Sequence, residues 1–108
     1  MANSEMSPEL LQRVAARFKA LGEPARLRIL QALRTGEKTV SDLMRDTELS
    51  QANTSRHLQM LHGLGFVERR KEGLYVLYRL ADESVMTMCD VMCGRLEQQF
   101  DSERRMFS

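Results

Sequence analysis

Two short stretches of this 108-residue sequence carry side chains whose types and spacing could do chemistry. Residues 50–59 combine hydroxyls, side-chain amides and Arg56. These groups can hydrogen-bond base edges, because arginine pairs with guanine and asparagine or glutamine with adenine. The second stretch holds Cys89 and Cys93, whose spacing of four would place both thiols on neighbouring turns of one helix face. Recognition of nucleic acid and thiol chemistry are therefore the activities that the surrounding elements must support.

The polar stretch is predicted to lie on a helix. Ser50 is a suitable N-cap, and Gly65 follows Leu64 as a C-terminal stop. On such a helix one face is apolar and the other is polar, which is equally typical of a plain solvent-facing helix. The polar face and first turn carry the candidate base-reading and phosphate-binding residues, which are Ser50, Gln51, Ala52, Asn53, Ser55, Arg56 and Gln59.

Apolar periodicity and capping residues predict the elements around this helix. Short helices within 40–64 would form a helix-turn-helix, and the β-branched and aromatic residues of 66–80 favour a hairpin, or wing. The predicted fold class is therefore mainly α with a β-hairpin, a winged helix-turn-helix in a single domain over 1–108. The other predicted helices cover about 8–21, 24–35, 40–46 and 82–100.

The charge distribution favours a nucleic-acid interface over a plain solvent face. The formal net charge is only +1, but residues 50–79 hold five basic and two acidic residues, whereas residues 80–108 hold three basic and six acidic. We expect the cationic middle of the chain to meet phosphates and the anionic end to face away from them. Arg69, Arg70 and Lys71 would then cluster at the tip of the wing and contact the DNA backbone.

Several segments together resemble the ArsR/SmtB group of winged helix-turn-helix repressors. The matching segments are LGEPARLRIL at 21–30, LSQ at 49–51, SRHL at 55–58 with Leu61, GFV at 65–67, RR at 69–70, EG at 72–73 and YRL at 78–80. Leu74 departs from the basic residue often found after the wing glycine, which would soften wing contacts. The resemblance implies a homodimer that binds an imperfect palindrome in promoter DNA and releases it when an inducer binds.

A dimer is also expected because a chain of this length buries a modest share of its surface. The resemblance places the dimer interface on the first and last helices, 8–21 and 82–100. Each helix carries an apolar stripe that one small domain cannot easily bury. The expected interface residues are Leu10, Val14, Phe18, Val85, Met92 and Leu96.

The inducer site is the least determined part of the prediction. No histidine follows Asp82, where many zinc-sensing members of the group begin a ligand set, and residues 39–64 contain no cysteine. Cys89 and Cys93 are the remaining candidates for an inducer site. They could co-ligate a soft metal ion such as Cu(I), bind arsenite with a third thiolate from the partner, or be oxidised or persulfidated. They could equally be packing residues in an apolar seam.

Neither histidine is interpreted as a metal ligand. His57 is expected to pack or to hydrogen-bond the backbone, and His62 lies five residues later rather than at the i, i+4 spacing of a shared ion. The sequence has no catalytic motif, so an enzyme is not expected. It also has no membrane-spanning stretch or secretory signal, so a cytoplasmic location and no membrane partner are expected.

These observations predict a transcriptional repressor that binds double-stranded promoter DNA as a homodimer. It would release that DNA on sensing a soft metal, a metalloid or a thiol-reactive species at Cys89 and Cys93. Two alternatives remain open, namely a winged-helix module that binds only other proteins and a repressor without thiol-based sensing. Salt-dependent DNA binding would separate the first alternative from the repressor.

Overall fold

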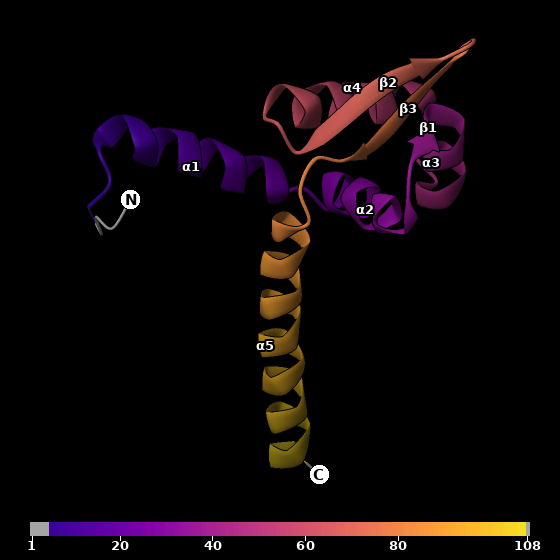
Figure 1. Ribbon diagram of the computed structural model, residues 1–108. Coiled ribbons are helices and arrows are strands. Elements are labelled where there is room, and N and C mark those ends of the chain that lie inside the picture. The colour runs from indigo at the N-terminus through magenta and orange to yellow at the C-terminus, as the bar shows by residue number, and fades with distance from the viewer. Residues whose placement is uncertain (1–4, 108) are drawn as a thin grey trace.

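The computed structural model describes residues 5–107, and it confirms the predicted mainly α fold with a winged helix-turn-helix. Helices α2, α3 and α4 pack with a small sheet, while α1 and α5 project from this body in different directions (Figure 1). In chain order the elements are α1 (Pro8–Leu21), α2 (Pro24–Ala32), the one-turn 3-10 helix η1 (Leu33–Thr35), β1 (Lys38–Thr39), α3 (Val40–Thr47), α4 (Gln51–Gly63), β2 (Val67–Glu72), β3 (Tyr75–Leu80) and α5 (Ser84–Phe107).

The sheet has three antiparallel strands in the order β1-β3-β2, one more than the sequence predicted. Lys38 of β1 pairs with Tyr78 and Thr39 pairs with Leu77. The hairpin turns through Gly73, whose φ of +60° is a left-handed value that suits glycine. Strand β1 therefore ties the hairpin to the helix that follows it, α3.

Two helices end at residues other than those predicted. The segment expected as one helix over 24–35 ends at Ala32 and continues as η1. Helix α5 was expected to end near residue 100 but reaches Phe107. No proline or glycine follows residue 100, and Arg104 pairs with Asp101 at 2.7 Å on the same helix. Such an i, i+3 ion pair supports helix continuation.

The core lies where α2, α3 and α4 meet the sheet. Ile29, Leu30, Leu43, Leu58 and Leu61 are fully buried there. Tyr78 and Val67 close the core from the sheet side, and Met86 closes it from the first turn of α5. Both helices of the helix-turn-helix are therefore held against a common apolar centre.

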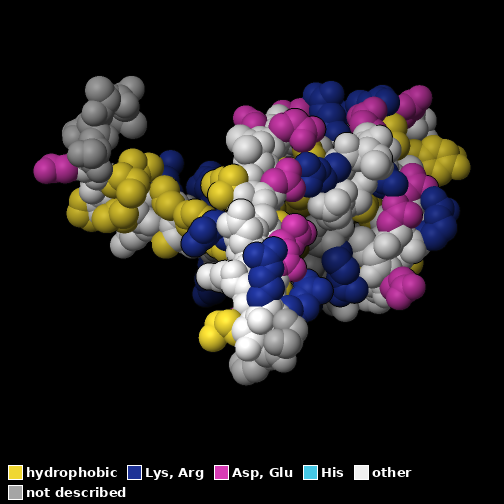
Figure 2. All heavy atoms as spheres, turned by 90° about the horizontal axis from the view of Figure 1, so that it is seen from below, with side chains coloured by type: hydrophobic (Ala, Val, Ile, Leu, Met, Phe, Trp, Pro, Cys, Tyr) yellow, Lys and Arg dark blue, Asp and Glu magenta, His cyan; other side chains and the backbone are white. Residues whose placement is uncertain are grey.

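Helices α1 and α5 leave apolar side chains in solvent. Hydrophobic side chains gather along α1 in the space-filling view (Figure 2), and Phe18 is 59% exposed. On α5, Met92 is 63% and Leu96 is 45% exposed. Val85 behaves differently from the other expected interface residues, because only 4% of it is exposed and it packs into the core of its own chain. Among the described residues no helix is long and apolar enough to cross a membrane.

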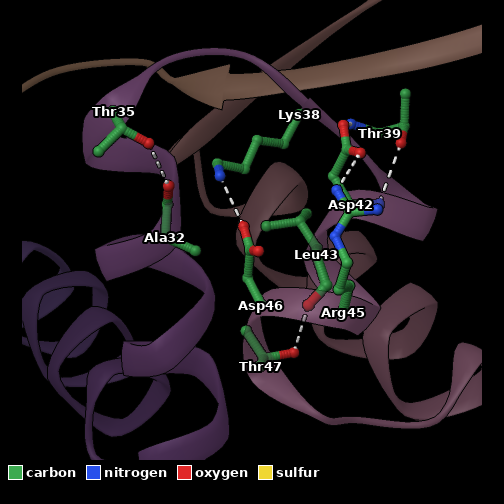
Figure 3. A network of polar contacts seen from close by, with 9 residues as sticks. All are labelled: Ala32, Thr35, Lys38, Thr39, Asp42, Leu43, Arg45, Asp46 and Thr47. Atoms are coloured by element: carbon green, nitrogen blue, oxygen red, sulfur yellow. Dashed lines mark hydrogen bonds and ion pairs between the residues drawn. The ribbon is translucent and has the colours of Figure 1, made fainter.

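Helix α3 begins with the predicted capping box (Figure 3). The backbone N–H of Asp42 donates to Thr39 Oγ1 at 3.1 Å, and the backbone N–H of Thr39 donates to Asp42 Oδ2 at 3.1 Å. The bond from the Thr39 backbone N–H stabilises the Asp42 carboxylate and is the largest cause of its lowered pKa. Beside the cap, Lys38 of β1 forms an ion pair with Asp46. The start of α3 is therefore fixed both by its cap and by the strand before it.

Replacing Thr39 with alanine should lower the free energy of unfolding by about 1 kcal/mol, because one backbone donor of α3 loses its partner. The measurement is urea denaturation followed by circular dichroism. Ser41→Ala is the matched control, since Ser41 is exposed on the same helix and makes no capping bond. Equal losses in the two variants would contradict this role of Thr39.

Candidate nucleic-acid interface

The position of α4 is set by its buried face. Thr54, Leu58 and Leu61 are fully buried, and His57 is 8% exposed. Ser50 caps the first turn, since its Oγ accepts a hydrogen bond from the backbone N–H of Asn53 at 3.1 Å. Because these contacts hold one side of α4 against the core, the opposite side is left facing solvent.

That opposite side carries the predicted reading residues. Ser55 is half-buried, and the other six are exposed: Ser50, Gln51, Ala52, Asn53, Arg56 and Gln59. Arg56 Nη2 donates to Asn53 Oδ1 at 3.0 Å. Helix α4 contains no aspartate or glutamate. The exposed face therefore presents an arginine, amides and hydroxyls without a negative charge that would repel phosphates.

The three basic residues predicted to share the wing tip are separated by the alternation of β2. Arg70 forms a two-point ion pair with Glu37, at 2.8 and 2.9 Å, and a third contact with Glu72 at 2.9 Å. These carboxylates raise the pKa of Arg70, and Arg70 lowers the pKa of Glu37. Arg70 is thus neutralised by its own chain, and it braces the hairpin against the segment before β1.

Arg69 and Lys71 lie on the other face of the hairpin. Both are exposed and have no ion-pair partner within residues 5–107. In the register Arg69 is paired with Tyr78, which is buried toward the helices. Paired residues share a face of the sheet, so these two cations extend the face that packs on the body. The tip itself is Leu74, which is 98% exposed.

The two cysteines of α5 lie in different surroundings. Cys89 is half-buried and packs against the core, whereas Cys93 is exposed. Cys93 Sγ donates to Glu97 Oε1 at 3.5 Å, and this hydrogen bond raises the pKa of the Cys93 thiol. Residues 5–107 contain no group of three or more histidine, cysteine or acidic side chains that could hold a metal ion. The pair therefore does not form a complete metal site within one chain.

Two contacts between distant segments were not predicted from the sequence. Arg26 contacts His57 behind the exposed face of α4, with 3.3 Å between Arg26 Nη1 and His57 Nδ1. Arg34 forms a two-point ion pair with Asp90, at 2.8 Å for each contact, and so joins η1 to α5. Both arginines lie far along the chain from their partners, so local spacing gave no signal for either contact.

The comparison with known proteins agrees with this geometry. A family model described as bacterial regulatory protein, arsR family, matches residues 23–69, which run from the start of α2 into β2. A transcriptional repressor SmtB homolog from Synechocystis sp. is 34% identical over 93 residues, which cover 86% of this chain and 70% of that protein. The chain belongs to the ArsR family. The resemblance proposed from the sequence is thereby confirmed.

Two further similarities concern this ArsR-family chain. A cadmium resistance transcriptional regulatory protein CadC homolog from Staphylococcus aureus is 37% identical over 90 residues, covering 82% of this chain and 74% of that protein. A solved homodimeric winged helix-turn-helix DNA-binding domain from Mycobacterium bovis, a possible ArsR-family regulator, has a TM-score of 0.78 and 31% identity. The structural match covers 93% of this chain and 95% of the Mycobacterium bovis chain.

Proposed function

We propose that this ArsR-family protein is a transcriptional repressor that binds promoter DNA as a homodimer in the cytoplasm, and that it is not an enzyme. Helix α4 would lie in the major groove of the DNA and the hairpin would contact the adjacent backbone. The observation that carries the proposal is the exposed face of α4, which holds Asn53, Arg56 and Gln59 and no acidic side chain. These residue types pair with guanine and adenine edges.

The first turn of α4 and the wing would supply phosphate contacts. Ser50, Gln51 and Ser55 lie at the helix N-terminus, where free backbone N–H groups and the helix dipole favour anions. Arg69 and Lys71 are the wing cations free to meet phosphates. Arg70 is held by Glu37 and Glu72, so we assign it to holding the wing in place rather than to DNA contact.

The homodimer would form through α1 and α5. In a single chain, Phe18 of α1 exposes a large share of its surface, and so do Met92 and Leu96 of α5. Leu10 and Val14, on the same helix as Phe18, are half-buried. A second copy would remove these side chains from water, at about 25 cal/mol per Å² of apolar surface. The similar domain from Mycobacterium bovis is homodimeric, which supports a homodimer here.

We also propose that Cys89 and Cys93 receive the inducer. Cys93 is exposed and Cys89 is only half-buried, so the packing within one chain does not seal the pair. Both lie on the helix that would form the dimer interface, where a change in packing could alter the spacing of the two α4 helices. The candidate inducers are a thiol-reactive species and a soft ion such as Cu(I) or arsenite, and the ion would need a further ligand beyond this pair.

Replacing Arg56 with alanine should weaken binding to the promoter site by about 1–3 kcal/mol while the fold is retained, because a base-reading side chain is lost. Fluorescence anisotropy with labelled upstream DNA measures the dissociation constant. Arg104→Ala is the control, since it removes the same charge near the far end of α5 (Figure 1). If both variants bind as tightly as the wild type, Arg56 does not contact the DNA.

Replacing Leu96 with glutamate should shift the dimer toward monomers by several kcal/mol, because a charge would be buried in the interface without a partner. Sedimentation equilibrium at about micromolar protein gives the oligomeric state, and DNA affinity should fall with it, since two half-sites must be held together. Gln98→Glu adds the same charge to α5 without removing an apolar side chain. A wild-type protein that stays monomeric at all accessible concentrations would refute the dimer.

Replacing both Cys89 and Cys93 with serine should leave DNA affinity nearly unchanged and abolish release by the inducer. In the wild type, a coupling of about 1.4 kcal/mol is enough to change DNA affinity tenfold. The protein–DNA complex is titrated with arsenite, Cu(I), peroxide and a persulfide donor while anisotropy is followed. Met92→Leu is the control, because it changes a neighbouring sulfur and keeps both thiols. Normal release from the double variant would exclude sensing by the thiols.

A further inference from the structure

The side chain of Arg26 joins the end of α1 to the buried side of α4. Its Nε donates to the backbone oxygen of Ala20 at 2.5 Å, and its Nη2 donates to that of Lys19 at 3.5 Å. Its Nη1 lies 3.3 Å from Nδ1 of His57. Ala20 and Lys19 belong to the last turn of α1, where carbonyl groups lack partners in a following turn. The Lys19 oxygen also accepts from the backbone N–H of Gly22 at 3.2 Å, so the shorter bond to Ala20 is the main link between Arg26 and α1. One guanidinium therefore contacts two helices that have separate roles in the proposed function.

This contact requires an uncharged His57. An arginine guanidinium has only donors, so Nδ1 of the imidazole must be the acceptor and the ring proton must be on Nε2. Protonation of Nδ1 would remove the acceptor and place two cations side by side. His57 is 8% exposed, so solvent can screen that repulsion only weakly.

The charges around His57 act in the same direction. Burial lowers its pKa most, followed by the positive charges of Arg26 from α2 and Arg56 from α4 itself. Glu23, the N-cap of α2, acts in the opposite direction and is the weakest of the four causes. Its carboxylate is also engaged, accepting from the backbone N–H of Ala25 at 3.3 Å.

We propose that Arg26 is a positioning residue that carries the orientation of α1 to α4 through neutral His57, so that acidification loosens α4 and weakens DNA binding. This inference rests on the proposed function, because α1 is a proposed dimer helix and α4 the proposed reading helix. It concerns residues that do not touch DNA. Arg26 would act on affinity only by setting where the exposed face of α4 lies relative to the partner's.

The direction of the pH effect follows from the lowered pKa. The ordinary pKa of histidine is 6.5, so on acidification the unfolded or loosened chain takes up a proton before the ordered one does. The stabilisation that comes from keeping His57 neutral, by burial first and by Arg26 second, is therefore complete above that pH. It is lost as the pH falls from there through the lowered pKa of the ordered chain. DNA affinity should fall over the same range.

Two substitutions of His57 test the inference. Asparagine places Oδ1 close to the position of Nδ1 and keeps an acceptor that cannot titrate, whereas leucine removes the acceptor. DNA affinity is measured by anisotropy at about pH 7.5 and about pH 5.5. Hydrogen exchange of the last-turn amides of α1 gives a readout that needs no DNA. His62→Asn is the matched control, since His62 lies on the same helix and is half-buried.

The wild type and His62→Asn should each lose about tenfold in DNA affinity on acidification, with faster exchange at the end of α1. His57→Asn should keep the neutral-pH affinity and lose most of this pH dependence. His57→Leu should bind about tenfold more weakly at both pH values while retaining its helical circular dichroism. Because leucine and asparagine both remove the imidazole, a role in packing alone would not separate them in this way.

Two results would overturn the inference. The first is an acid-dependent loss in His57→Asn as large as in the wild type, and the second is neutral-pH affinity in His57→Leu equal to that of the wild type. A wild-type protein that binds no promoter DNA at about pH 7.5 would overturn the proposed function as well. In that case the hydrogen-exchange data would still report whether the contact between α1 and α4 depends on His57.

Discussion

The burial of one face of α4 is the constraint on which the rest of the interface depends. Leu58 and Leu61 are fully buried against the core, so the helix cannot rotate without exposing large apolar side chains. Because that face is fixed, the exposed side of α4 is fixed as well. Strand β2 begins four residues after α4 ends, so the same packing sets where the wing starts. The proposed base-reading residues and the proposed wing contacts are thereby placed on neighbouring elements of the chain.

Helices α1 and α5 are the elements through which we propose that two copies associate. They project from the body (Figure 1) and keep large apolar side chains in solvent, which favours a second copy as their partner. Each is tied back to the body by an arginine, with Arg26 reaching the end of α1 and Arg34 pairing with Asp90 of α5. The exposed Arg34–Asp90 ion pair contributes little stability. The value of both contacts here is geometric, because they join the proposed dimer helices to the elements that hold α4.

Elements defined by local signals were predicted from the sequence, and contacts between distant segments were not. The caps at Thr39 and Ser50 marked the starts of α3 and α4, since a hydroxyl followed by helix-forming residues is a local pattern. Strand β1 was missed because two residues show no alternation. Arg70 was grouped with Arg69 and Lys71 because its partner Glu37 lies 33 residues away. Val85 was expected at a dimer interface because a periodic apolar stripe does not reveal which of its members pack within the chain.

The proposed function requires two copies of α4 to read two related half-sites. Hydroxyl-radical footprinting of the upstream DNA with increasing protein tests it most directly. We expect two protected patches about 34–36 Å apart along the duplex, one helical turn, related by twofold symmetry and appearing together as protein is added. A single patch, uniform protection along the duplex, or no protection at concentrations where the protein is folded would contradict the account.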